Sequence, residues 1–217
     1  HFISLSHACQ IRFRDTPHVT RLATSLFLQD TELEGRLPSK PQFGKVDYPG
    51  ADIQEPEPGI YPNIGIMDIK AMYHSNAAKH NISWDTLSPD GVDCGNGSRF
   101  LQGKKGLLVR TMDKLTNKRN EYKAMMKSDP DNKTTWDAMQ HAMKSLVASL
   151  YGICGDSKFG MYHPEIAAAI TYTSRQTLFE LRDICEEYGH TCRYGHTDSV
   201  FVDVDSPEIG QELIVKK

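Results

Sequence analysis

The chain has 217 residues, enough for one domain or two closely joined ones. Its 25 basic and 28 acidic side chains give a formal net charge of −3, which disfavours a simple basic surface for nucleic acid. No apolar run approaches the roughly 18 to 20 residues of a membrane-spanning helix and no signal segment opens the chain, which argues against membrane and secreted proteins. The five cysteines form no CxxC pair, so neither a disulfide framework nor a zinc site is indicated.

The first half of the chain alternates apolar-periodic segments with glycine- and proline-rich ones. Thr20 is a possible cap for a helix that starts at residue 21. The elements predicted in order are a helical opening at residues 3–27, a loop at 35–50, a strand at 60–68, a helix at 75–80 and an exposed loop at 88–97.

The second half is predicted to be mainly helical. The predicted elements are an amphipathic helix at residues 106–126, a turn at 128–132, a helix at 134–150, a helix at 164–188 and a β-hairpin at 191–204. Between residues 104 and 127 eight basic side chains face only two acidic ones, which makes this segment a candidate for binding a polyanion.

Two acidic residues stand at the ends of strand-like runs. Asp68 ends the strand predicted at residues 60–68, and Asp198 lies in the turn of the predicted hairpin. We expect them on neighbouring strands, where two carboxylates could hold two magnesium ions about 3.5 to 4 Å apart for an in-line phosphoryl displacement.

Basic and aromatic residues on the helical hairpin could bind the substrate of such a centre. Arg119 and Lys123 are four residues apart and hence share a helix face, and Lys144 lies on the second helix. Together they could clamp a triphosphate. Tyr151 and Gly152 would offer a flat, closely approachable surface to a base pair.

These constellations, in this order, resemble the polymerase region of family B DNA polymerases. The similar stretches are DIKAMYHS at 68–75 (DxxSLYPS in the family), KSLVASLYG at 144–152 (KxxxNSxYG), YGHTDS at 194–199 (YGDTDS), YPGA at 48–51 (YxGG/A), NIS at 81–83 and PEIAAAIT at 164–171 (PExAxxIT). The resemblance extends over residues 48–205.

The resemblance implies an α+β fold, with an antiparallel palm sheet backed by helices and an inserted antiparallel helical hairpin as fingers. The implied divisions are an N-terminal helical or connecting segment at 1–45, the palm at 46–103 and 153–217, and the fingers at 104–152. The chain is expected to lack thumb and exonuclease regions, which would then lie elsewhere in a larger polymerase or in a second polypeptide.

The resemblance also implies a role for each matching residue. Asp68 and Asp198 are the implied catalytic residues, and they are implied to bind the metals together with the Ile69 carbonyl. The implied nucleotide contacts are Ala71, Met72, Tyr73, Arg119, Lys123 and Lys144. The implied DNA contacts are Tyr48, Gly50, Tyr151, Gly152 and Thr197. Tyr73 would exclude a ribose 2′-hydroxyl. We therefore expect the chain to bind two Mg²⁺ ions, a dNTP and primer–template DNA. We also expect it in the cytoplasm or nucleoid, from a viral, archaeal or bacterial source.

Several departures from the family pattern bear on the implied site. His196 replaces the first Asp of YGDTDS, Ala148 replaces the Asn of the second motif, His74 replaces Pro, and Asn76 replaces an apolar residue. The loss of one carboxylate predicts altered rather than abolished activity, because Asp198 matches the metal-bridging position.

Two other functions are compatible with these residues. One is a polymerase-like subunit that holds primer and template without extending them. The other is a palm-type cyclase or nucleotidyltransferase that acts on free nucleotides, which would leave the 144–152 stretch unexplained.

Overall fold

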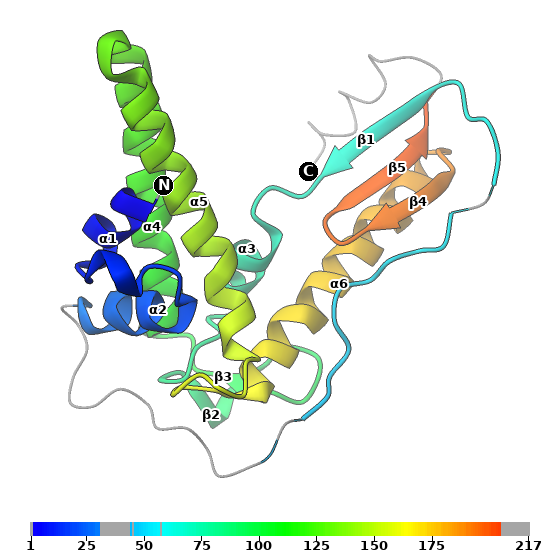
Figure 1. The fold of residues 1–217 in the computed structure, drawn as a ribbon. Helices are drawn as coiled ribbons and strands as arrows, with labels where there is room; N and C mark the ends of the chain where they lie inside the picture. The colour runs from blue at the N-terminus through cyan, green and yellow to red at the C-terminus, as the bar shows by residue number, and fades with distance from the viewer. Residues whose placement is uncertain (1, 31–43, 45, 57, 205–217) are drawn as a thin grey trace. The chain divides into compact units, whose positions relative to one another are not determined.

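The computed structural model describes residues 2–30, 44, 46–56 and 58–204, which form the elements drawn in Figure 1. The chain divides into two compact units, each described by itself. Unit 1 comprises His1–Tyr48 and Ala77–Ile170, and unit 2 comprises Pro49–Asn76 and Thr171–Lys217. The boundaries of these units differ from those predicted for palm and fingers. The division into palm and fingers therefore stays a prediction. No helix in the described ranges is long and apolar enough to cross a membrane.

Unit 1 opens with two helices, α1 at Phe2–Cys9 and α2 at Val19–Leu28, separated by a 3₁₀ turn. The predicted helical opening is therefore interrupted. The predicted cap at Thr20 is wrong, because α2 already begins after His18 and the Thr20 carbonyl accepts a bond from Thr24 Oγ1 at 2.8 Å.

A hairpin of β2 (Leu87–Asp93) and β3 (Arg99–Phe100) replaces part of the predicted exposed loop at 88–97. Turn-forming residues are tolerated in β2 because of close packing: a Cβ on Gly91 would lie 2.4 Å from the backbone of Phe100. Only the segment from Cys94 to Gly97 forms a turn, in which the second and fourth residues are glycines with positive φ.

The predicted helical hairpin is confirmed, and both helices are longer than expected. Helix α4 spans Leu107–Ser128, a 3₁₀ turn spans Pro130–Asn132, and α5 spans Lys133–Cys154. Near the tip Tyr122 stacks on Trp136 with ring centroids 6.1 Å apart. This aromatic pair joins the two helices where their other side chains are mostly exposed.

Asn81, the first residue of the NIS stretch, fastens the start of α4. Its amide nitrogen donates to the carbonyls of Leu101 and Lys104 at 2.6 and 2.8 Å, and its amide oxygen accepts from Gly106 N–H at 2.8 Å. Its φ of +52° is a left-handed conformation that asparagine tolerates better than most residues. The side chain is 6% exposed, so these bonds are sheltered from water.

We expect Asn81→Ala to lower the free energy of unfolding by about 2 to 4 kcal/mol, because it removes three sheltered hydrogen bonds and leaves backbone groups unsatisfied. Chemical denaturation followed by circular dichroism measures this change. Asn120→Ala, at an exposed position of α4, is the control and should leave stability nearly unchanged. Equal midpoints for both variants would contradict the role given to Asn81.

Unit 2 is built on an antiparallel sheet in the order β1-β5-β4, with bounds Ile64–Asp68, Ser199–Asp203 and Cys192–His196. The predicted strand and hairpin are confirmed, although β1 begins later than residue 60. Helix α6, Pro164–Glu187, lies behind the sheet (Figure 1), and Gly189 follows it with a φ of +82°. Helix α3, Met72–Lys79, follows β1.

One face of this sheet is buried against α6. Met67, Val200 and Val202 from the strands pack with Leu178 and Cys185 from the helix, and all five are at most 6% exposed. Because side chains alternate along a strand, the residues between them lie on the opposite face. This alternation places Asp68 and Ser199 on the face away from α6.

Candidate functional site

The two acidic residues predicted from sequence come together in unit 2. Asp68 is the last residue of β1 and pairs with Ser199, the first residue of β5. Directly beyond this pair, Ile69 N–H donates to the Asp198 carbonyl at 2.8 Å. The prediction that Asp68 and Asp198 stand on neighbouring strand ends is therefore confirmed.

The side chains around Asp68 form a row across the sheet. Cross-strand partners share a face, and Ser199 is the partner of both Asp68 and His196. Ser199 Oγ donates to Asp68 Oδ1 at 3.1 Å. Asp68 and His196 are exposed, so the row ends in accessible side chains on both outer strands.

Backbone and side-chain contacts hold the turn that carries Asp198. Thr197 N–H donates to the Asp52 carbonyl at 2.9 Å, and Arg182 from α6 pairs with the Asp52 carboxylate at 2.7 Å. A Cβ on Gly195 would lie 2.2 Å from the Arg182 guanidinium. The glycine of YGHTDS therefore leaves room for the arginine that fixes this edge of the sheet.

Two residues beside the acidic pair have unusual backbone conformations. Ala71 and Thr197 have φ values of +52° and +57°, which cost non-glycine residues free energy and are concentrated at functional sites. The bend at Ala71 turns the chain from β1 into α3 within three residues of Asp68. The first N–H groups of α3, from Met72 onward, have no partner within the helix.

Tyr73, in the first turn of α3, is half-buried near the acidic pair. Its pKa is raised above the usual value of a phenol, first by burial and then by the negative charge of Asp198. Both effects favour the neutral phenol. The ring is therefore close enough to Asp198 to feel its charge, and its contact with a sugar stays a prediction.

Asn76, one of the departures from the family pattern, is buried with its hydrogen-bonding groups used. Its amide nitrogen donates to the Met72 carbonyl at 3.0 Å, and its amide oxygen accepts from Thr177 Oγ1 of α6 at 2.9 Å. Sequence reasoning missed this role. The available signal was the series of polar residues Thr171, Ser174 and Thr177, spaced three apart along one face of α6.

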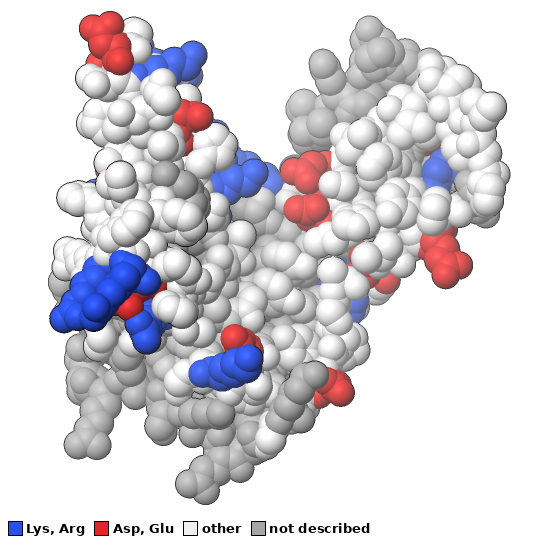
Figure 2. All heavy atoms as spheres, in the orientation of Figure 1, with Lys and Arg blue, Asp and Glu red and all other residues white. Residues whose placement is uncertain are grey.

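The predicted triphosphate clamp lies in unit 1, on the helical hairpin. Arg119 and Lys123 lie on α4 and Lys144 lies on α5. Arg119 faces the partner helix, because its Nε donates to Gln140 Oε1 at 3.2 Å. Within the described ranges no carboxylate pairs with any of these three basic residues. Figure 2 shows side chains of both charges along this hairpin.

Some of the basic residues between 104 and 127 are already neutralised. Arg110 makes two bonds of 3.1 Å to the Asp30 carboxylate, with both side chains at most 12% exposed, and Lys105 pairs with Asp113 at 2.7 Å. The number of charges available to a polyanion is therefore smaller than the sequence indicated.

The residues predicted to contact DNA have different surroundings. Gly152 is exposed, and a Cβ built there would meet no atom within 4 Å. The Tyr48 hydroxyl instead lies against Gly155, where a Cβ would be 1.9 Å away. The Gly50 carbonyl accepts from Arg175 at 2.6 Å. Gly152 thus leaves open space beside it, whereas Tyr48 and Gly50 pack within their own units.

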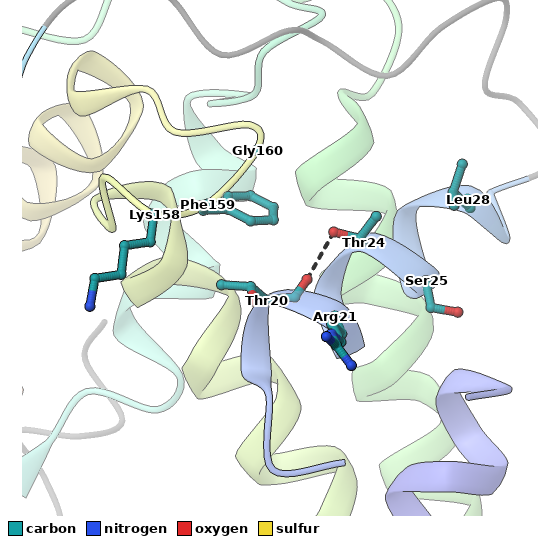
Figure 3. A pocket seen from close by; sticks show the side chains of 8 residues that line it. All are labelled: Thr20, Arg21, Thr24, Ser25, Leu28, Lys158, Phe159 and Gly160. Atoms are coloured by element: carbon teal, nitrogen blue, oxygen red, sulfur yellow. Dashed lines mark hydrogen bonds between the residues drawn. The ribbon is translucent and has the colours of Figure 1, made fainter. Parts of the chain in front are cut away.

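Two of the surface cavities in the described part of unit 1 are lined by none of the site residues predicted from sequence. One, of about 330 Å³, is shown in Figure 3; the other is of about 250 Å³. Arg21, which lines the first, pairs with Asp15. The second is lined by Lys114 and Lys118 of α4 together with apolar and neutral polar side chains, among them Leu26 and Gln29. No group of three His, Cys, Asp or Glu residues able to hold a metal occurs in the described ranges.

Comparison with known proteins identifies the family. Residues 20–215 match DNA polymerase family B. The chain is 32% identical over 178 residues to a DNA polymerase of Thermococcus gorgonarius, covering 78% of this chain and 23% of that protein. It is 28% identical over 206 residues to DNA polymerase 2 of Aeropyrum pernix, covering 89% of this chain and 26% of that protein.

A solved structure supports the same fold. The family B DNA polymerase of Pyrobaculum calidifontis aligns with a TM-score of 0.76 and 24% identity, covering 99% of this chain and 30% of that one. The chain thus spans about a quarter of the length of the curated archaeal relatives named here. The mixed helical and antiparallel-sheet fold predicted from sequence is confirmed, and the chain belongs to DNA polymerase family B.

Proposed function

We propose that the chain carries the catalytic centre of a template-directed DNA polymerase, which transfers a nucleotidyl group from a dNTP to a primer 3′-hydroxyl and releases pyrophosphate. The observation that carries this proposal is the convergence of Asp68 and Asp198 at adjacent strand ends in a family B chain. A DNA substrate would place the chain in the cytoplasm or nucleoid. Thumb and exonuclease functions would come from elsewhere in the same polypeptide or from a second one.

The donor set around the acidic pair fits divalent magnesium. Neither Asp68 nor Asp198 has a basic partner among the described residues, so both carboxylates can bind a cation, and the Ile69 carbonyl is adjacent in sequence. Bound metal would polarise the phosphoryl oxygens and stabilise the charge that develops during displacement. Ser199, by donating to Asp68, would fix the orientation of that carboxylate.

The remaining residues would bind and orient the substrates. Arg119, Lys123 and Lys144 would hold the triphosphate, with backbone amides at Ala71 and Met72 contributing donors. Phosphoryl transfer mainly requires that the reactants are aligned and that negative charge is neutralised. These contacts would meet both requirements, and the protein would not need to form a covalent bond to the substrate. The remaining proposed contacts are with DNA, by Tyr48, Gly50, Tyr151, Gly152 and Thr197.

Magnesium-dependent incorporation of one labelled dNTP into a primer–template tests this function. We expect extension only of the primer, and only with the dNTP that complements the template. Label joined to free nucleotides without a template would favour a cyclase or free-nucleotide transferase. DNA binding without any extension would favour the primer–template-binding subunit.

One observation favours the second of these alternatives, in which the chain is a catalytically weakened subunit that binds primer and template. His196 occupies the position of a carboxylate in the family motif and lies in the same cross-strand row as Asp68. The imidazole supplies no negative charge to offset the cations of the centre. The chain's affinity for magnesium should therefore be lower than that of a centre with three carboxylates.

We expect His196→Asp to lower the Mg²⁺ concentration for half-maximal incorporation about two- to fivefold, since one added exposed charge is worth up to about 1 kcal/mol. A magnesium titration of single-nucleotide incorporation measures this shift. His196→Asn, which adds no charge, serves as the control. An unchanged midpoint in His196→Asp would mean that this position does not influence the cations.

A further inference from the structure

Arg119 is held by a neutral partner. Its Nε donates to Gln140 Oε1 of α5 at 3.2 Å, across the helical hairpin. Gln140 is 6% exposed, whereas Arg119 is half-buried. The glutamine is therefore a sheltered polar side chain whose acceptor faces the one arginine of the proposed triphosphate clamp.

The chemistry of its neighbours determines the orientation of the Gln140 amide. Gln140 Nε2 lies 3.0 Å from Asp137 Oδ1, one helical turn earlier on α5, and 2.7 Å from Nδ1 of the adjacent His141. A carboxylate can only accept hydrogen bonds and a guanidinium can only donate them. The amide must therefore point its nitrogen at Asp137 and its oxygen at Arg119. The result is a directed chain of hydrogen bonds from Arg119 through Gln140 to Asp137.

Another arginine of α4 shows what a charged partner does. Arg110 binds the Asp30 carboxylate through Nε and Nη2, both at 3.1 Å, and this pair is almost fully buried. That carboxylate takes up the planar fork of the guanidinium and cancels its charge. The Gln140 amide instead occupies only the Nε of Arg119. The outer nitrogens and the full positive charge of Arg119 stay available.

We propose that Gln140 is a positioning residue for nucleotide binding: its neutral amide fixes the Arg119 guanidinium across the hairpin without neutralising it. This inference rests on the proposed function, in which Arg119 binds the triphosphate. Asp137 in turn holds the amide at the far end of the chain of hydrogen bonds. A glutamate at residue 140 would retain an acceptor for Arg119 but form an ion pair with it.

Binding of inorganic tripolyphosphate to the full chain, measured by calorimetry, tests this role independently of the acidic centre. We expect Gln140→Glu, which is almost isosteric, to weaken binding about tenfold, or about 1.4 kcal/mol. Gln140→Met, which removes the acceptor but adds no charge, should weaken it about threefold because Arg119 loses its orientation. In an Arg119→Ala background the Gln140→Glu change should have less than a twofold effect.

A purely structural role for Gln140 would not depend on Arg119 in this way. Gln176→Glu on α6 introduces the same charge at an exposed position and controls for net charge. If both Gln140 variants bind tripolyphosphate with wild-type affinity while Arg119→Ala binds it more weakly, the positioning role of Gln140 is overturned. The assignment of Arg119 to the triphosphate would then still stand. Wild-type affinity in Arg119→Ala would instead overturn the assignment of Arg119 to the triphosphate, and the inference with it. Melting temperatures test whether each variant is folded. If Gln140→Glu does not fold, the tripolyphosphate affinity of Gln140→Met decides whether Gln140 positions Arg119.

Discussion

Asp198→Ala is expected to reduce magnesium-dependent incorporation by at least about 1000-fold, because several kcal/mol of transition-state stabilisation by bound cations are lost. Asp198 lies in the turn that pairs with the chain directly after Asp68, so it stands beside the other acidic residue of the proposed centre. Single-turnover incorporation of one labelled dNTP into a primer–template measures the change.

The control for Asp198→Ala is Asp90→Ala, an exposed carboxylate in β2 of unit 1. It removes the same charge without touching the acidic pair and should retain wild-type activity. Primer binding, followed by fluorescence anisotropy, should persist in Asp198→Ala, because the substitution removes a proposed metal ligand rather than a proposed DNA contact. Equal incorporation by Asp198→Ala and wild type would rule out the proposed centre and favour the binding subunit.

Tyr73→Ala is expected to reduce discrimination against ribonucleotides about 100-fold, because the ring would be the only bulk against a ribose 2′-hydroxyl. The half-buried ring lies in the first turn of α3, close enough to Asp198 for that charge to raise its pKa. Competing incorporation of a dNTP and the matching rNTP gives the ratio of the two kcat/KM values.

Tyr73→Phe separates the ring from its hydroxyl group. It should discriminate as well as wild type, because exclusion depends on ring volume rather than on a hydrogen bond. A loss of selectivity in Tyr73→Phe as large as in Tyr73→Ala would point to the hydroxyl instead. Unchanged selectivity in Tyr73→Ala would show that another residue selects the sugar.

Local patterns in the sequence were sufficient to predict the main elements of this chain. Apolar periodicity predicts the helical hairpin and α6, and alternation with a short turn predicts the β4–β5 hairpin. The acidic pair could be predicted because each carboxylate stands at the end of a strand-like run. These features are short-range, so a single stretch of residues contains the information.

Long-range contacts, in contrast, could only be seen in three dimensions. Ser88 to Gly91 has the composition of a turn, but it forms a strand because Gly91 packs against the Phe100 backbone. Charge counting likewise overestimated the free positive charge near α4, because Arg110 is neutralised by Asp30, 80 residues away in the chain.

The polar supports of the site depend on the same kind of contact. Asn76 bonds to Thr177, Ser199 to Asp68, and Gln140 to Arg119. Residue identities and spacing therefore determined which chemistry this chain can carry, namely an acidic pair and a basic hairpin in a family B polymerase. Folding decided which of those side chains are oriented, neutralised or left exposed, because hydrogen bonds and ion pairs depend on distances between residues that are remote in sequence.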